Sequence, residues 1–251
     1  MSIPNFEDIF YPSAPDMFKS FLPDFAPDSE KQSRVVLLPH SELSVVAPLI
    51  YTSLSYLKPA KNILVLSAFH STTEAGLYGT DQKEMNSVFG KAKLNTFDTL
   101  MTRPQLFEGE YTTELTINAL MRYYPNSTYY PIMCAMNSKK DIASLKAILT
   151  FAMTSGFSIV VSGNITAKDS KVAIDKEVTL LTSLLKERAP LLDEIRRGHI
   201  NCCCAYILEA LSIIPSPLEF LSFKCGTYTS PTLEIEKGDG SIYFASAKIN
   251  L

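Results

Sequence analysis

Residues 35–70, VVLLPHSELSVVAPLIYTSLSYLKPAKNILVLSAFH, form the stretch that decides the fold. Residues 35–38 are a continuous apolar run, which is typical of a strand buried on both faces. Pro39 ends this strand because proline lacks the backbone donor that a central strand needs. Apolar residues then recur at helical spacing over 46–57, and residues 63–66 form a second buried run. The stretch therefore predicts a strand, a helix and a second strand.

A strand, a helix and a strand in this order predict a right-handed crossover between parallel strands. Each of the two strands is followed by a histidine, His40 after the first and His70 after the second. Because parallel strands end at the same edge of a sheet, we expect both histidines at its carboxyl edge. Open α/β sheets bind their ligands at that edge.

The rest of the chain repeats the alternation of strands and helices, and it predicts an α/β fold. In this fold a single, mostly parallel or mixed central sheet is flanked by helices. Residues 1–33 are expected to form an arm with one short helix near 16–22, packed on the body. Residues 71–96 are expected to form a hairpin or a loop over the sheet edge. Further strands are expected at 129–135, 157–164, 218–224 and 241–249, and helices at 110–124, 141–151, 172–187, 189–197 and after the cysteine run at 202–204.

Composition limits the class of protein. The chain has 251 residues, 46% of them hydrophobic, and no linker or change of composition, which favours one domain over residues 1–251 rather than two. The net charge is −3 with basic residues dispersed, so nucleic acid is not an expected partner. No signal-like N-terminus or long apolar run is present, so no membrane association is expected. The five cysteines include three adjacent ones, a poor disulfide framework, which favours a reduced, cytoplasmic protein.

Seven short segments, in order along nearly the whole chain, resemble the Memo family, also called AmmeMemoRadiSam system protein B. The segments are Phe10-Tyr11-Pro12, Pro39-His40, LSAFHS at 66–71, EYTTE at 110–114, VVSGNITAKD at 160–169, Cys202 with Ile207, and SIYFASA at 241–247. They are similar to the family's FYP, motif histidine, LGPSHH, EHSxE, VVSSDFSHYG, CGxxPI and final strand. The resemblance implies a fold related to the class III extradiol dioxygenases. It also implies that His40, His70 and Cys202 form a metal-binding trio.

The chain departs from the family pattern at several polar positions. Glu42 replaces a glycine, Ser71 the second histidine of the SHH pair, and Tyr111 the histidine of EHS. Asn164 replaces an aspartate, and Ala167 replaces a histidine. The resemblance therefore implies a divergent member that has lost much of its acid/base equipment.

Two imidazoles and a thiolate suit a borderline-to-soft metal, and the expected cofactor is a transition metal (iron, copper or zinc) or none. Three protein ligands with an open position are the pattern of a catalytic site rather than a closed structural one. The alternative is that each histidine is only a hydrogen-bonded residue of the cleft. Asn164 weighs towards that alternative because an amide neither neutralises a cation nor orients an imidazole as firmly as a carboxylate does.

Glu110 and Asn164 are the candidates for catalytic residues. Glu110 is favoured over Glu114 because the family's EHS motif faces the cleft, and the alternative for both is a solvated first turn of a helix. Among the other candidate side chains, Cys203 and Cys204 are expected to be packing residues, Cys134 and Cys225 buried inert thiols, and His199 a surface residue.

Two functions from different classes remain open on the sequence. The first is a metal-dependent oxidoreductase resembling extradiol dioxygenases, although Ala167 removes the family's base and argues against ring cleavage. The second is a non-catalytic, metal-free protein that holds a small molecule, a peptide or a partner protein in the cleft at the carboxyl edge.

Overall fold

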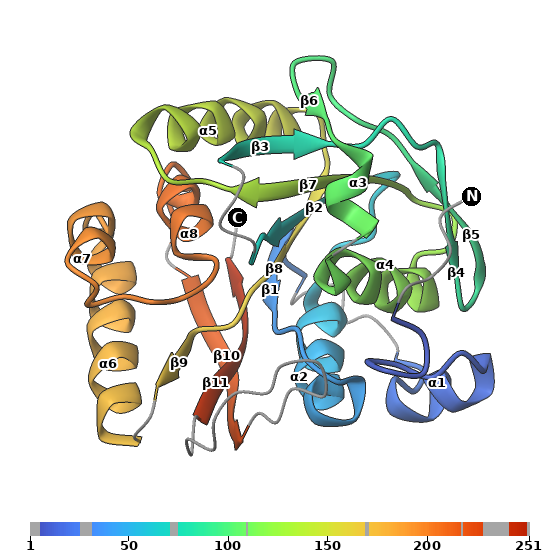
Figure 1. Cartoon of the computed structure of the whole chain (residues 1–251), viewed down its shortest axis with the longest axis horizontal. Coiled ribbons are helices and arrows are strands. Elements are labelled where there is room, and N and C mark those ends of the chain that lie inside the picture. The colour runs from blue at the N-terminus through green and yellow to red at the C-terminus, as the bar shows by residue number, and fades with distance from the viewer. Residues whose placement is uncertain are drawn as a thin grey trace.

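The computed structural model describes residues 6–25, 32–70, 75–108, 110–168, 171–216, 218–227 and 241–249 (Figure 1). The helices of these ranges are α1 (Pro15–Phe21), α2 (Leu43–Tyr56), α3 (Pro104–Glu108), α4 (Tyr111–Tyr123), α5 (Lys139–Thr154), α6 (Lys171–Glu187), α7 (Leu192–Arg196) and α8 (Ala205–Leu211). The strands are β1 (Val35–Leu38), β2 (Asn62–Ala68), β3 (Gly76–Gly79), β4 (Glu84–Ser87), β5 (Gly90–Leu94), β6 (Met101–Thr102), β7 (Thr128–Ala135), β8 (Ser158–Ser162), β9 (Thr166–Lys168), β10 (Leu218–Thr227) and β11 (Ser241–Ile249).

All of these strands belong to one mixed sheet, with the main order β10-β11-β1-β8-β2-β7-β3-β6. Its centre, β1-β8-β2-β7, is parallel throughout. Antiparallel strands extend it on both sides, β11 beside β1 and β3 beside β7. The crossover predicted from residues 35–70 is present, and β8 lies between its two strands. The predicted α/β fold with helices around a mixed sheet is confirmed.

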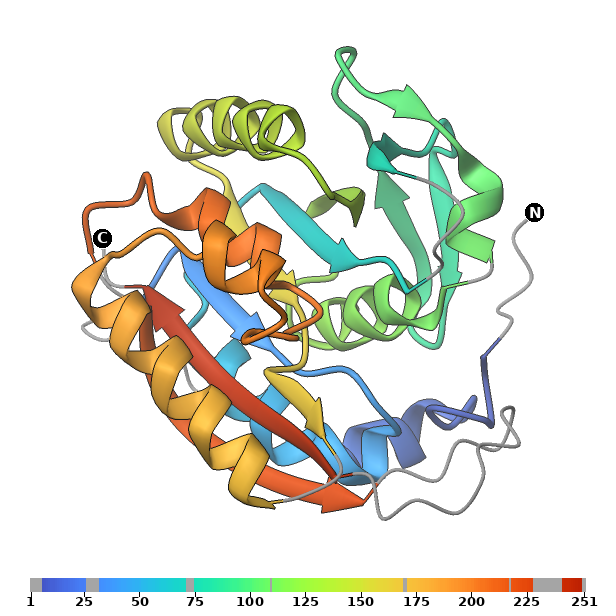
Figure 2. The same cartoon turned by 60° about the vertical axis from the view of Figure 1, so that its left-hand side comes forward.

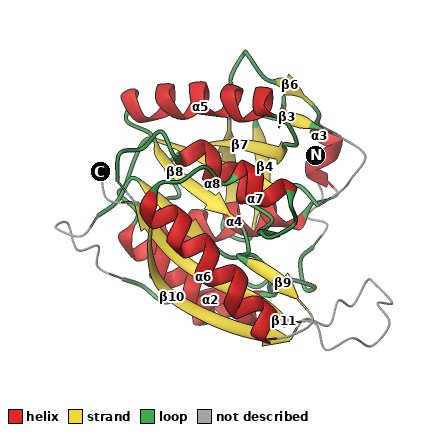
Figure 3. Ribbon diagram, turned by 90° about the vertical axis from the view of Figure 1, so that its left-hand side faces the viewer, coloured by secondary structure: helices red, strands yellow, loops and turns green. Residues whose placement is uncertain are grey.

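The central strands are apolar on both faces because helices cover both faces. Val35 and Leu37 of β1 belong to a core with α5, α6, α7 and α8. Val36 and Leu38, the alternate residues, belong to a second core with α1, α2 and α4. Figures 2 and 3 show α6 lying along β11, and the views agree that α2 lies on the opposite side of that strand. The continuous apolar runs in the sequence therefore follow from burial on two sides.

Several local expectations can be compared with the described residues. Phe10, Phe18 and Leu22 of the N-terminal segment are buried in the second core, and α1 lies where a short helix was predicted. Strands β4 and β5 pair as an antiparallel hairpin within the stretch predicted as a hairpin or loop. The helix predicted at 189–197 is shorter, Leu192–Arg196 with Leu191 as its N-cap. Ala189 is outside it because the residue before a proline is disfavoured in helical conformation. Among the helices described, none is both long and apolar enough to cross a membrane.

Candidate metal centre

The candidate site lies where the central parallel strands end. His40 follows β1 by two residues, Asn164 follows β8 by two, and His70 follows β2 by two. Since β8 lies between β1 and β2, Asn164 comes between the two histidines in the sheet order. The expectation that His40 and His70 share the carboxyl edge is confirmed.

His40, His70 and Cys203 form a group whose possible ligand atoms all lie within 4.8 Å of one another. The two imidazole centroids are 5.0 Å apart and the rings are nearly perpendicular, at 86°. The sulfur of Cys203 lies 3.8 Å from Nε2 of His40. His40 is buried and Cys203 half-buried, whereas 44% of the His70 side chain is exposed, so the group reaches solvent on the His70 side.

The third member of this group is Cys203, not Cys202 as the family resemblance implied. Cys202 is buried in the first core, and its sulfur contacts that of Cys204 at 3.1 Å. The expectation that Cys203 is only a packing residue is also wrong, because its thiol lies against His40. The three side chains diverge: Cys204 lies against Gly163 at the end of β8, Cys202 lies in the first core, and Cys203 is the one whose sulfur comes within reach of both histidines.

His40 is held by the residues at the end of β8. Its Nδ1 lies 3.1 Å from the hydroxyl of Ser162, so Nε2 is the nitrogen that faces Cys203. The side chain of Asn164 makes two hydrogen bonds to the backbone of His40. Its Oδ1 accepts from the His40 N–H at 3.1 Å, and its Nδ2 donates to the His40 carbonyl at 2.9 Å. The backbone N–H of Asn164 donates to the Cys203 sulfur at 3.0 Å. Asn164 thus positions the backbone of His40 and the sulfur of Cys203. The imidazole ring of His40 is oriented instead by Ser162, a residue that was not among the candidates predicted from the sequence.

Glu110 orients His70. It is the N-cap of α4, and its buried carboxylate accepts from the Thr112 N–H at 3.4 Å. The same carboxylate accepts from the backbone N–H of His70 at 3.2 Å and lies 3.0 Å from Nδ1 of that ring. With Nδ1 bound to a carboxylate, Nε2 is left for coordination, which is the arrangement that commonly supports metal-binding histidines. The preference for Glu110 over Glu114 at the site agrees with this placement, since Glu114 accepts instead from the Tyr11 hydroxyl.

His70 interacts with both Glu110 and Cys203, and the pKa values of these three groups are shifted. Burial opposes protonation of His70, but its hydrogen bonds to Cys203 and Glu110 outweigh burial and raise its pKa to about 10. Burial likewise opposes ionisation of Glu110, but the interactions with His70 leave its pKa below the usual 4.5. The hydrogen bond from Cys204 is the largest influence on Cys203, and with His40 and His70 it holds the pKa of that thiol well below 9.0. The site therefore favours a thiolate at Cys203, which is the form that binds metals.

The surroundings of the group are tightly packed. Gly163 has no room for a Cβ because Cys204 lies against it. The ring of Tyr111 lies edge-on to His40, with centroids 5.8 Å apart at 90°, and stacks on Phe10 at 3.9 Å and 9°. The N-terminal segment therefore reaches the site through an aromatic stack.

The remaining candidates lie away from the group. His199 is exposed and pairs with Glu194 at 2.7 Å, as expected of a surface residue. Cys134 is buried, and burial raises its pKa, which agrees with an inert thiol. Ala167 lies in β9 opposite Ile242 of β11. The side chain of Cys225 lies outside the described residues.

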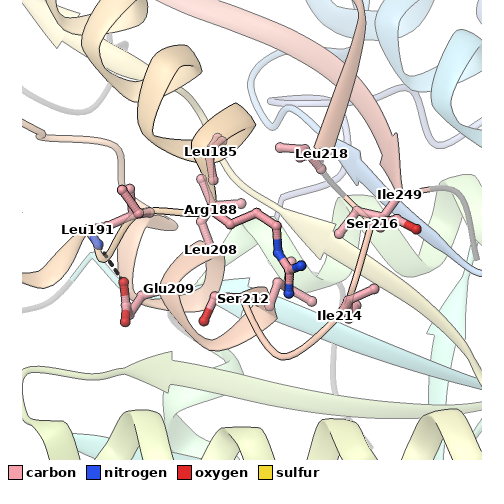
Figure 4. A pocket seen from close by; sticks show the side chains of 12 residues that line it. Leu185, Arg188, Leu191, Leu208, Glu209, Ser212, Ile214, Ser216, Leu218 and Ile249 are labelled. Atoms are coloured by element: carbon pink, nitrogen blue, oxygen red, sulfur yellow. Dashed lines mark hydrogen bonds between the residues drawn. The ribbon is translucent and has the colours of Figure 1, made fainter.

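A separate cavity lies between the end of α6, α8 and the last two strands (Figure 4). Leu185, Leu208 and Ile249 line it, and the Arg188 side chain reaches into it. Its volume of about 30 Å³ holds no more than about two water molecules. It is distinct from the histidine and cysteine group.

Comparison with known proteins adds little to this geometry. No family profile matches the chain, and no curated protein matches it. Among solved structures, the chain is similar to the uncharacterized protein JW3007 from Escherichia coli K12. That likeness has 15% sequence identity and a TM-score of 0.49, and it covers 86% of this chain and 99% of the other.

Proposed function

We propose that this chain is a divergent relative of the Memo family that binds one transition-metal ion through His40, His70 and Cys203. The observation that carries the proposal is the convergence of these three ligand atoms within 4.8 Å, from segments far apart in the sequence. The seven resembling segments support the family relationship and the link to the class III extradiol dioxygenase fold. Two imidazoles and a thiol suit zinc, copper or iron.

The donor set fits a metal in its details as well. Each histidine has its Nδ1 engaged, by Ser162 in one case and Glu110 in the other, so that both present Nε2. The hydrogen bond from Cys204, with the two histidines, favours the thiolate form of Cys203. The backbone N–H of Asn164 donates to the same sulfur. Three protein ligands leave a position open, and His70 lies on the solvent side of the group.

A bound metal would act as a Lewis acid towards a small molecule or the terminal group of a peptide entering this open position. The protein supplies the orientation: Glu110 and Ser162 hold the rings, and Asn164 holds the backbone of His40 and the sulfur of Cys203. The loss of the family's histidine at Ala167 favours binding over ring cleavage. A metal-dependent oxidoreductase is the second candidate function, and the open position on the His70 side is the observation that favours it.

The test is elemental analysis of protein purified without chelators and without an affinity tag. We expect about one metal ion per chain in the wild type, and its loss in His40→Ala and Cys203→Ser. Cys202→Ser is the matched control, because its thiol is adjacent in sequence but lies in the core; it should retain the metal.

The proposal fails if the wild type remains metal-free after reconstitution with zinc, copper and iron salts. It also fails if Cys202→Ser loses the metal while Cys203→Ser keeps it. For the second function, oxygen consumption with catechol-like compounds separates the two readings: the binding function predicts none.

A further inference from the structure

Two thiols flank Cys203 in the chain and contact each other. The Sγ atoms of Cys202 and Cys204 lie 3.1 Å apart, and only 6% and 0% of these residues is exposed. A disulfide joins two sulfurs at about 2.05 Å, so closing this pair needs a movement of about 1 Å. Neither thiol is a ligand in the metal proposal, although that of Cys204 donates a hydrogen bond to Cys203.

The surrounding backbone holds this pair together. The carbonyl of Cys202 accepts from the N–H of Ala205 at 3.1 Å, and the carbonyl of Cys204 accepts from that of Leu208 at 2.9 Å. The side chain of Cys204 lies against Gly163, where a Cβ would collide with it. Both sulfurs are therefore confined to one small space in the core.

The sulfur of Cys203 has contacts outside this pair. Its sulfur accepts from the Asn164 N–H at 3.0 Å and lies 3.8 Å from Nε2 of His40. It also hydrogen-bonds Cys204, but a bond between adjacent cysteines would close a small ring around a peptide group that resists leaving planarity. The pair separated by one residue is the better placed of the two.

We infer that Cys202 and Cys204 form an oxidisable dithiol that closes to a disulfide around Cys203. With a hydroperoxide as the oxidant, both S–H bonds and the O–O bond break, and one S–S bond forms. The two sulfurs lose two electrons in total and the peroxide oxygens gain them. The two thiol protons pass to those oxygens, which leave as water and an alcohol, or as two waters from hydrogen peroxide. Cys203 is not part of this bond; its sulfur keeps its contacts with Asn164 and His40.

The experiment uses the full chain, freed of metal and treated with hydrogen peroxide. Remaining thiols are alkylated after denaturation. The mass of the tryptic peptide 198–224 is then measured by mass spectrometry, because this peptide contains these three cysteines and no others. In the wild type we expect the mass of this peptide to be lower by two hydrogen atoms, and we expect the peptide to carry one alkyl group. Cys203→Ser, the matched control, should show the same loss with no alkyl group. Cys202→Ser and Cys204→Ser should show no loss.

The inference is overturned if the wild-type peptide keeps three alkylated cysteines or gains only oxygen. It is also overturned if the loss persists in Cys202→Ser or Cys204→Ser, because the bond would then involve Cys203. Circular dichroism checks that each variant is folded. If a serine variant does not fold, Cys202→Ala or Cys204→Ala is used in its place. Because Cys203→Ser removes a proposed ligand and leaves the dithiol intact, failure of metal binding leaves this result readable.

Discussion

Glu110 shows how one side chain serves both the helix and the site. As the N-cap of α4 it accepts a backbone N–H of that helix, and with the other contacts of its carboxylate it holds the backbone and the ring of His70. A carboxylate behind a coordinating histidine orients the ring and raises its basicity. Glu110 is therefore expected to support the metal without touching it.

Replacing Glu110 by Gln should weaken metal binding. We expect the dissociation constant to rise by about 10- to 100-fold, the usual cost of losing such a supporting contact. Competition with a chromogenic chelator measures it. Glu84→Gln is the control, because Glu84 is exposed and pairs with Lys91 in the β4–β5 hairpin, at 2.6 Å. An equal loss in both variants would contradict the role assigned to Glu110.

The same pair should make the stability of the metal-free protein depend on pH. The pKa of Glu110 is lowered from 4.5, so its contribution is present above that pH and lost as the pH falls through its folded-state value. The pKa of His70 is raised from 6.5 to about 10, so its contribution is complete below 6.5 and lost as the pH rises through about 10.

Thermal unfolding of chelator-treated protein tests this dependence. The gap in Tm between the wild type and Glu110→Gln should be widest between pH 4.5 and 6.5 and should narrow on both sides of that window. A gap that stays constant from acid to alkaline pH would show that the pair does not stabilise the fold through charge.

At the scale of elements, α6 holds the segment that carries the cysteines. Glu177 of this helix is buried; its carboxylate accepts from the Thr166 hydroxyl of β9 at 2.7 Å and from the backbone N–H of Asn201. Asn201 directly precedes the three cysteines. This one carboxylate therefore ties β9 and the approach to α8 to the same helix.

Glu177→Ala should lower the free energy of unfolding by about 1–3 kcal/mol, because it leaves the buried hydroxyl of Thr166 and the part-buried N–H of Asn201 without their acceptor. Glu177→Gln should cost much less, since an amide can accept from Asn201 and donate to the Thr166 oxygen. Urea unfolding of both variants measures the difference. Equal losses would show that the charge, rather than the hydrogen bonds, is what the site needs.

At the scale of the molecule, the proposed ligands join parts of the chain that only the fold brings together. The unfolded chain separates residues 40, 70 and 203 and has no preformed site, so a metal held by these three residues would bind the folded state preferentially. Ligand binding of this kind stabilises the whole protein in proportion to the logarithm of the ligand concentration.

Zinc at about 100 times its dissociation constant should therefore stabilise the protein by about 2.7 kcal/mol. For a chain of this size that corresponds to a rise in Tm of about 5–10 °C. Differential scanning fluorimetry measures it, with Cys202→Ser expected to keep the rise and Cys203→Ser to lose it. A rise retained in Cys203→Ser would place the zinc at some other site.

Much of the fold was predictable because burial on two faces leaves a simple pattern. The apolar runs of β1, β2 and β8 and the helical spacing of α2 and α5 are local features. The short α7 was less predictable, since Pro190 delays its start. Ser162 could have been noticed as the polar end of an apolar strand, but nothing local says which ring it meets.

The sequence by itself determined the alternation of strands and helices. From that alternation it follows that His40 and His70 lie at the same edge of one sheet. It did so because strand direction and side-chain periodicity are properties of short segments. Only the tertiary structure decided which cysteine joins them. In a run of three identical residues the choice depends on what each side chain packs against, and here the core and Gly163 hold Cys202 and Cys204 while His40 and Asn164 receive Cys203.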